Sequence, residues 1–458
     1  MESISKLMNP NIFQPPTVLS SDEIREILAR RIDNQKQAVG IVAGVTEPNG
    51  RRVVAYGNLA NGDPRTLDGD TIFEIGSVTK VFTSLLLADM VNRKEVTLDD
   101  PAAMYLPEKV KMPQRSGKSI TLLDLSTHSS GLPCVPSNLK PKDPLNPYAN
   151  RSVDDLYQFL SGYELPRDPG SEYEYSNLGA GLLGHLLAHR AGTDYESLIR
   201  TRITEPLSMP DTVITLSSSM KQRMATGHNA LLAPVANWGL SPLAGAGALR
   251  SSANDMLTFL EAFLGYKETP LAPAMKAMLE VRRPAGPGGI AKIGLGWLIL
   301  GESPWHSGGT GGFRSFVGYD PKARTGVVVL SNASTLTGVD DIGGHIWNPK
   351  VPLANPEPPK QRTEIRIDPE LLDNYTGRYQ LPDRILEITR DGDRLFVQGF
   401  GPQGIGGPKF EMAAESEKSF FVKVTGSQIT FETGPDGRAT GLVMHRVGRE
   451  PMLAPRLS

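Results

Sequence analysis

A serine and a lysine three residues apart, Ser77 and Lys80, open a short apolar helical pattern. Ser77 follows Gly76, and apolar side chains recur at helical spacing from Val81 to Met90. Residues three apart share one face of a helix, so we expect the Lys80 amine within hydrogen-bond reach of the Ser77 hydroxyl. Partial burial lowers a lysine pKa from its ordinary value of ~10.4 and lets the amine act as a base. The pattern predicts a nucleophilic serine.

The same Ser-x-x-Lys spacing also begins at Ser3, Ser137 and Ser218, so the spacing alone is not specific. Those three serines stand in polar or proline-flanked stretches, whereas Ser77 stands at the start of an apolar helix, where the N-terminal N–H groups favour negative charge. The alternative is a solvated first-turn serine beside a surface lysine. Context favours Ser77.

A second proton-transfer group is expected from a Tyr-x-Asn pattern, which begins at Tyr56, Tyr148 and Tyr175. Tyr175 and Asn177 follow the turn residues 169–171 and precede an apolar helical stretch. A loop-to-helix junction orients a side chain toward a site, so Tyr175 is the candidate. The alternative is a buried structural tyrosine with one hydrogen bond.

A third element is the glycine-rich run that starts at His306, with four glycines between residues 308 and 312. Glycines have no side chain to cover the backbone, so a substrate can approach and hydrogen-bond to the edge of the adjoining strand. A backbone N–H here, with that of Ser77, forms a candidate oxyanion hole, in which one donor contributes ~10²–10³ in rate. A glycine-rich turn is the alternative, although it leaves the histidine unexplained.

Hydrophobic periodicity places strands at both ends of the first 345 residues and helices between them. If the closing strands pair with the opening ones, the fold class is α+β: an antiparallel sheet flanked by helices, with an inserted helical subdomain. The expected strands are Ala38–Val45, Arg52–Gly57, Ile293–Leu300, Phe313–Tyr319 and Val327–Asn332. The expected helices are Ser21–Asp33, Val78–Arg93, Val153–Leu160, Leu178–Ala191, Tyr195–Ile203 and Ala253–Leu264.

Residues 349–361 carry five prolines and predict a linker between two domains. Beyond it, short alternating strands with Gly and Asp turns indicate a small all-β barrel or sandwich. The expected organisation is a first domain at 1–348, the linker at 349–361 and a C-terminal β domain at 362–458.

Composition excludes several function classes. The 458 residues include 48 Lys and Arg and 50 Asp and Glu, a net charge of -2. This charge gives no reason to expect that the protein binds nucleic acid. No apolar run is long enough to span a membrane. The single cysteine, Cys134, makes no intrachain disulfide and no multi-cysteine metal site. Residues 1–20 do not resemble a secretory signal, which predicts a cytoplasmic location unless a leader has been removed.

The three motifs, in their order along the chain, resemble those of the serine β-lactamase and penicillin-binding-protein superfamily. The resemblance is closest to its class C-like branch of esterases, D-amino-acid peptidases and β-lactamases. Two further stretches, Leu122–Leu132 and Gly245–Met256, are also similar to that family. The resemblance covers residues 20–345. The C-terminal segment resembles the lipocalin-like or short β-barrel appendage of some members.

The resemblance implies a role for each residue of the first two motifs. Ser77 is the acylated nucleophile, and Lys80 helps to deprotonate it. Tyr175 is the general acid and base for the leaving group and the deacylating water. Asn177 orients Lys80 or the substrate amide. No metal or organic cofactor is implied.

The third motif departs from the family. His306 takes the place of the lysine in a Lys-Thr-Gly triad, and Gly308 and Gly309 would bind substrate, with Gly309 the oxyanion partner of Ser77. Histidine is mostly neutral near pH 7 and shorter than lysine, so binding of a substrate carboxylate should be weaker.

This departure favours a carboxylesterase or a D-amino-acid peptidase or amidase with weak β-lactamase activity, acting on small-molecule or peptide substrates. Three alternatives remain. They are a class C-type β-lactamase or penicillin-binding carboxypeptidase, a peptide cyclase or thioesterase, and a non-catalytic sensor that is acylated without turnover. A homo-oligomer is left open.

Overall fold

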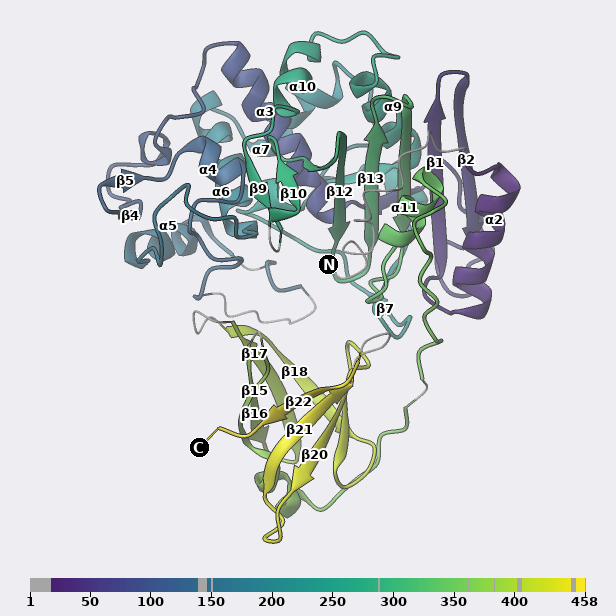
Figure 1. The fold of residues 1–458 in the computed structure, drawn as a ribbon, viewed down its shortest axis with the longest axis vertical. Helices are drawn as coiled ribbons and strands as arrows, with labels where there is room; N and C mark the ends of the chain where they lie inside the picture. Colours follow the sequence, from purple (N-terminus) through teal and green to yellow (C-terminus); the bar gives the residue numbers. More distant parts are fainter. Residues whose placement is uncertain are drawn as a thin grey trace.

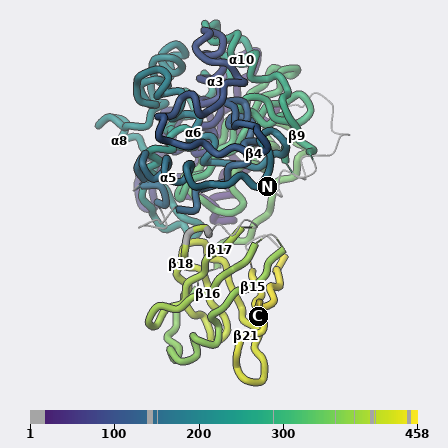
Figure 2. The backbone as a smooth tube through the Cα atoms, turned by 90° about the vertical axis from the view of Figure 1, so that its left-hand side faces the viewer, coloured from purple at the N-terminus to yellow at the C-terminus, as the bar shows by residue number. Residues whose placement is uncertain are grey.

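The computed structural model describes residues 18–138, 146–149, 151–286, 289–360, 362–382, 384–401, 406–445 and 450–457. The chain forms a larger body of helices around a sheet and a smaller, all-β body beneath it (Figure 1). A view turned by 90° shows the same two lobes (Figure 2). Most of the stretch from which location was predicted, residues 1–17, lies outside the described residues.

The larger body is built on an antiparallel sheet in the order β2-β1-β14-β13-β12-β11-β10-β9. β1 pairs with β2 on one side and with β14 on the other, which confirms that the closing strands join the opening ones. The strands are β1 (Gly40–Glu47), β2 (Gly50–Gly57), β9 (Arg283–Ala285), β10 (Ala291–Ile293), β11 (Leu298–Leu300), β12 (Ser303–Gly309), β13 (Arg314–Asp320) and β14 (Thr325–Ser331).

Helices cover both faces of this sheet, because its central strands alternate apolar side chains toward two cores. In β14, Val327 and Val329 face the core under α2 (Ser21–Ala29) and α11 (Asp340–Trp347). Val328 and Leu330 face the larger core, which holds the central helix α3 (Thr79–Asn92).

The chain between β2 and β9 supplies the inserted helices, several of which lie on the left in Figure 1. Its helices are α3, α4 (Leu122–Ser126), α5 (Val153–Gly162), α6 (Asn177–Ala191), α7 (Tyr195–Ile199), α8 (Ser218–Arg223), α9 (Ala253–Phe263) and α10 (Ala272–Met278). Short strands pair within it: β3 (Ile72–Glu74) with β8 (Arg250–Ser252), β4 (Gln114–Arg115) with β5 (Lys118–Ser119), and β6 (Gly227–His228) with β7 (Pro234–Val235).

Two predicted elements differ from the structure. The first helix has Ser20 as its N-cap, with Glu23 completing a capping box, and it passes into a π-helical turn at Arg30–Asn34. The predicted strand Ile293–Leu300 is two strands, β10 and β11, because the chain reverses between them. A Cβ on Gly294 would lie 2.1 Å from the Met278 carbonyl oxygen, so only glycine fits there.

The smaller body is an eight-stranded antiparallel sheet, β15 to β22, in which each strand pairs with the next. The chain end returns to β15, where Leu457 N–H donates to the Arg378 carbonyl at 2.7 Å, so the sheet is a nearly closed barrel. Tyr375, Phe420 and Phe431 stack in its interior. The strands are β15 (Gly377–Gln380), β16 (Ile385–Asp391), β17 (Arg394–Phe400), β18 (Gly406–Ala414), β19 (Ser419–Val422), β20 (Gln428–Thr433), β21 (Ala439–His445) and β22 (Met452–Pro455).

The stretch between the two bodies is held by the larger one along much of its length. A buried ion pair joins Arg31 to Asp341 at 2.5 Å, and the same carboxylate accepts from the Ala354 N–H at 2.8 Å. Farther along, the Gln37 amide donates to the Glu357 carbonyl at 3.1 Å. Residues of the smaller body begin to bond the chain at Arg362, which pairs with Glu415.

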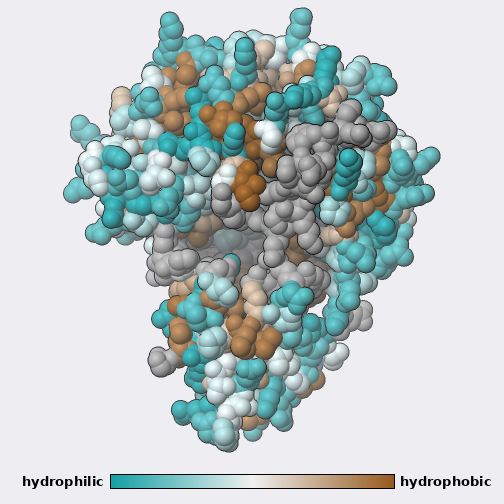
Figure 3. All heavy atoms as spheres, viewed as in Figure 1, coloured by the Kyte–Doolittle hydropathy of each residue, from teal (hydrophilic) through white to brown (hydrophobic). Residues whose placement is uncertain are grey.

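Exposed hydrophobic side chains are spread over the surface rather than gathered on one element. The view in Figure 3 shows a mostly hydrophilic surface with brown patches on both bodies. Among the most exposed are Met104, Val281, Ile290 and Leu453.

We predict that trypsin separates the two bodies by cutting after Lys360. The backbone around the equally exposed Lys350 is bonded to Asn348 and followed by the buried Val351, so it resists the protease. Mass spectrometry of a limited digest should show a fragment ending at Lys360 before any fragment ending at Lys350. Cleavage at Lys350 first, or inside the β barrel, would contradict a junction at residues 358–361.

Candidate active site

Ser77 lies in a single 3₁₀ turn, Gly76–Val78, between β3 and α3. The α-helix itself begins at Thr79, so the serine stands just before it rather than inside its first turn. Gly76 takes a positive φ of 50°, which lets the chain turn sharply out of the strand. The Ser77 side chain is half-buried, and α3 behind it is buried from Thr79 to Met90.

Lys80 is buried, and its amine contacts three acceptors. The Nζ atom lies 2.9 Å from Ser77 Oγ, 2.8 Å from Asn177 Oδ1 and 2.7 Å from the Ala246 carbonyl oxygen. An ammonium group has three N–H donors, so each has one acceptor. The predicted contact between Ser77 and Lys80 is therefore present.

Burial lowers the pKa of Lys80 to about 7. A large fraction of the amine is then neutral near pH 7, with two N–H donors and one lone pair. The Ala246 carbonyl and the Asn177 amide oxygen can only accept, so they keep the two donors. The lone pair is left for Ser77, whose hydroxyl can donate as well as accept.

Tyr175 contacts the same serine from the other side. Its hydroxyl lies 2.6 Å from Ser77 Oγ, and Lys80 Nζ lies 4.8 Å from the centre of its ring. Burial raises the pKa of Tyr175 well above its usual range, so the resting phenol keeps its proton. The ring of His128 packs 4.6 Å from the Tyr175 ring and fixes its position.

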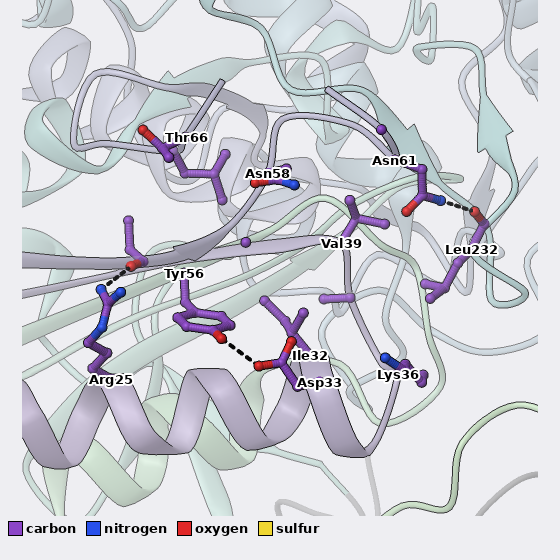
Figure 4. A pocket seen from close by; sticks show the side chains of 15 residues that line it. Arg25, Ile32, Asp33, Lys36, Val39, Tyr56, Asn58, Asn61, Thr66 and Leu232 are labelled. Atoms are coloured by element: carbon purple, nitrogen blue, oxygen red, sulfur yellow. Dashed lines mark hydrogen bonds between the residues drawn. The ribbon is translucent and has the colours of Figure 1, made fainter. Parts of the chain in front are cut away.

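The other two tyrosines of the same pattern lie elsewhere. Tyr56 donates to Asp33 at 2.5 Å, beside a cavity of about 650 Å³ between β2 and the first helix (Figure 4). That cavity is lined by none of Ser77, Lys80 and Tyr175. Tyr148 is buried against Trp238, and its hydroxyl faces Asn177. Of the three tyrosines, Tyr175 bonds the serine.

The alternative Ser-x-x-Lys pairs do not form such a cluster in the part of the chain that is described. Ser218 opens α8, a short helix with no buried side chain. Ser3 and Lys140 lie outside the described residues.

The glycine-rich run forms the end of β12 and lies against the Ser77 turn. A Cβ on Gly308 would lie 2.0 Å from the Ile75 carbonyl oxygen and 3.0 Å from Ser77 N, so no side chain fits. A Cβ on Gly76 would lie 2.6 Å from Gly309 N. The backbone N–H groups of Ser77 and Gly309 thus lie on neighbouring segments.

β12 leaves one edge unpaired at this point. Its neighbour β11 pairs only with residues 303–305, and β13 pairs along the other edge from Trp305 to Gly309. Within the described residues, the edge from His306 to Gly309 therefore meets no strand on the Ser77 side. An extended substrate can bond there.

His306 is buried in β12, and burial lowers its pKa to about 3. The ring is therefore neutral near pH 7. Its Nδ1 lies 2.6 Å from the Ser307 carbonyl oxygen, which can only accept, so Nδ1 carries the proton of the neutral ring. That N–H is used within the chain, so the neutral ring has no second N–H to donate to a substrate.

Sequence reasoning missed several members of the cluster. The Ala246 carbonyl comes from a 3₁₀ turn at Ala244–Ala246; Ala246 lay in the family-like stretch Gly245–Met256 but had no assigned role. His128 was part of a family-like stretch but had no assigned role. The Cys134 thiol lies 3.7 Å from the Asn177 amide nitrogen, a contact between residues far apart in the chain.

No group of three or more His, Cys, Asp or Glu side chains within the described ranges is arranged to hold a metal ion. Nor does any helix there have the length and apolar character to cross a membrane.

Comparison with known proteins decides the family. Residues 24–345 match the beta-lactamase family. The chain belongs to that family. It is a serine hydrolase of the β-lactamase and penicillin-binding-protein type. Residues 361–455 of this beta-lactamase family member match a domain of unknown function, DUF3471.

Two relatives and two structures show the extent of the similarity. The D-alanyl-D-alanine-carboxypeptidase/endopeptidase AmpH of Escherichia coli is 29% identical over 316 residues, which cover 66% of this chain and 81% of AmpH. A beta-lactamase of the same species is 27% identical over 314 residues, covering 60% of this chain and 79% of that protein.

A class C beta lactamase from Rhodobacter sphaeroides superimposes with a TM-score of 0.60 at 25% identity, covering 72% of this chain and 97% of its own. A beta-lactamase/D-alanine carboxypeptidase from Yersinia pestis, complexed with citrate, gives a TM-score of 0.61 at 26% identity, covering 71% and 95%. The similarity to those enzymes therefore covers 71–72% of this family member's chain.

We predict that a fluorophosphonate labels Ser77 and that Ser77→Ala abolishes the labelling. Tyr175→Phe should reduce ester turnover ~10²-fold or more, because it removes a proton-transfer group. Tyr56→Phe is the matched control, since Tyr56 bonds Asp33 at another place, and it should leave turnover unchanged. Peptide mapping and steady-state kinetics test both statements. A label on Ser137 or Ser218, or the reverse order of the two tyrosine variants, would place the site elsewhere.

We predict that kcat/KM rises with pH through about 7 as Lys80 loses its proton, because only the neutral amine can accept the serine proton. The pKa is lowered by burial, so activity is lost below it and present above it. A pH profile of ester hydrolysis measures this rising limb. Lys80→Arg, which stays charged, should show low activity at every pH; a variant that keeps the same rising limb would exclude Lys80 as its source.

Proposed function

We propose that this hydrolase forms an acyl-enzyme on Ser77, with Lys80 as the base that accepts the serine proton. The arrangement of acceptors around Lys80 supports this role, because its lone pair has no partner but Ser77. The neighbouring turn and β12 supply the N–H groups of Ser77 and Gly309 as an oxyanion hole. Developing negative charge on the substrate oxygen would be stabilised between them.

Tyr175 is proposed as the donor of a proton to the leaving group. Its high pKa keeps the phenol protonated, and its short contact with Ser77 Oγ places that proton beside the bond that breaks. In deacylation the roles reverse: water gives a proton to the Tyr175 phenolate and attacks the acyl carbon. The bond from that carbon to Ser77 Oγ then breaks as the Lys80 ammonium returns a proton to the serine. Asn177 holds Lys80 through its amide oxygen, and its amide nitrogen faces Cys134.

The proposed substrates are esters and amides that carry no carboxylate near the bond to be broken. His306 supports this choice, because the ring is neutral and its single N–H is used by the Ser307 carbonyl. The names of the relatives favour a second candidate, a D-alanyl-D-alanine carboxypeptidase or β-lactamase, whose substrates carry a carboxylate. The cytoplasmic location stays a prediction.

We predict that a nitrophenyl acetate is hydrolysed with higher kcat/KM than a cephalosporin. His306→Lys introduces a cation beside the scissile bond and should shift the ratio of the two toward the cephalosporin by about 5–30-fold, the value of one partly solvated charge-assisted bond. His306→Gln, which adds no charge, is the control. An unmodified enzyme that already prefers the cephalosporin would put the carboxypeptidase or β-lactamase reading first.

A further inference from the structure

The glycine-rich run that carries Gly309 needs support from outside itself. Four glycines lie between residues 308 and 312, and glycine has more backbone freedom than any other residue. An oxyanion hole stabilises charge well only when its N–H groups are fixed in place before the reaction. A neighbouring segment must therefore hold Gly309, and β13, which pairs with this end of β12, carries the candidate.

Arg314 lies directly opposite Gly309 in the pairing of β12 with β13. Side chains of opposed residues share one face of a sheet, so the Arg314 side chain lies where a side chain of residue 309 would be. A Cβ on Gly309 would lie 2.6 Å from Arg314 Nη1 and 3.3 Å from its Cζ. The guanidinium thus occupies the side-chain space of the proposed oxyanion residue.

Four backbone carbonyls accept hydrogen bonds from this guanidinium. Its Nη1 donates to the carbonyls of Thr310 at 3.2 Å and Phe313 at 3.1 Å, in the turn that follows Gly309. Its Nε donates to the Thr335 carbonyl at 3.2 Å, and its Nη2 donates to the Ser334 carbonyl at 3.1 Å. One planar group therefore joins the glycine-rich turn to the loop after β14.

The loop that receives these bonds is itself fixed to the body of the protein. The Thr335 hydroxyl donates to the Gln37 carbonyl at 3.0 Å, and the Ser334 N–H donates to the His228 carbonyl at 2.8 Å. The Ser334 hydroxyl also donates to the Gly311 carbonyl at 2.7 Å. The guanidinium thus ties the glycine-rich turn to an anchored segment.

The other face of β13 contacts the other half of the proposed oxyanion hole. The Ser315 hydroxyl donates to the Ile75 carbonyl at 2.8 Å, just before the turn that carries Ser77. Neighbouring residues of a strand point to opposite faces of the sheet, so Arg314 and Ser315 act on two sides of β13. This strand therefore contacts both segments that supply the N–H groups.

We propose that Arg314 is a positioning residue of the oxyanion hole, which holds the Gly309 N–H where the negative charge of the substrate oxygen develops. This inference rests on the proposed function, because it concerns the same acyl transfer. A lysine cannot replace the arginine. Its ammonium is a point charge with three donors, whereas the planar guanidinium reaches four carbonyls on two segments.

Hydrolysis of a nitrophenyl acetate by the full-length Arg314→Lys and Arg314→Ala proteins tests this role. Loss of one oxyanion donor costs ~10²–10³ in rate, and a misplaced donor costs part of that, so we expect kcat to fall ~10–100-fold in both variants. KM should stay within about threefold, because the interaction is made in the transition state. The rising limb of the pH profile at about 7 should keep its place, since Lys80 and its acceptors are unchanged.

Arg456→Lys is the matched control. Arg456 also donates to backbone carbonyls, those of Ala439 and Thr376, but it does so in the β barrel. The variant should keep the parental kcat and KM. An Arg314→Lys protein that also keeps the parental kcat would overturn the positioning role.

Gly309→Ala gives a second test, because its methyl group meets the guanidinium. We expect kcat to fall about tenfold in the parent protein but to change less than about twofold in the Arg314→Ala protein, where the space is vacant. Additive effects, or a Gly309→Ala protein with the parental kcat, would overturn the positioning role while leaving the serine hydrolase intact. The single Gly309→Ala result decides this even where an Arg314 variant does not fold. Hydrolysis that persists in Ser77→Ala would instead overturn the proposed function.

Discussion

The site depends on an amine that is buried among acceptors. Removing an ammonium group from water is costly, and Lys80 is tolerated in the core because Ser77, Asn177 and Ala246 each take one of its hydrogens. The same burial lowers its pKa to about 7, which makes the neutral base available. In the proposed mechanism, the side chain that is costly to bury is also the base that activates the serine. This arrangement requires three separate segments of the chain, which carry Ser77 and Lys80, Asn177, and Ala246, to meet in the fold.

The second constraint is the close approach of two backbones. The turn before α3 and the end of β12 lie so near each other that Gly76 and Gly308 have no space for a side chain. This contact places the N–H groups of Ser77 and Gly309 side by side and leaves the β12 edge open beside the serine. Beside this fixed frame lies His306, which is buried and neutral at the place where the family resemblance would put a lysine.

The pattern of hydrophobic residues was enough to predict the sheet and its inserted helices, because the β1 and β14 strands alternate apolar side chains over two cores. The hydrophobic pattern did not predict where the chain turns between β10 and β11. Ile293–Leu300 is uniformly apolar apart from its glycines and looks like one strand. The chain reverses between Gly294 and Trp297, where Gly296 takes a positive φ and Gly294 lies against the Met278 carbonyl, contributed by α10. Rules that assign strands from the local sequence do not include the contact with Met278.

For the site, the sequence determined the chemical groups and their local spacing. Ser77 and Lys80 are one helical turn apart, so their contact follows from helix geometry alone. Tertiary structure decided which tyrosine joins them, since Tyr56, Tyr148 and Tyr175 carry the same short pattern, and in the fold Tyr175 packs on His128 and bonds the serine. It also decided the state of each group: the lowered pKa values of Lys80 and His306 arise from burial in the folded chain. Those surroundings exist only once the chain has folded, because desolvation is a property of the packed core.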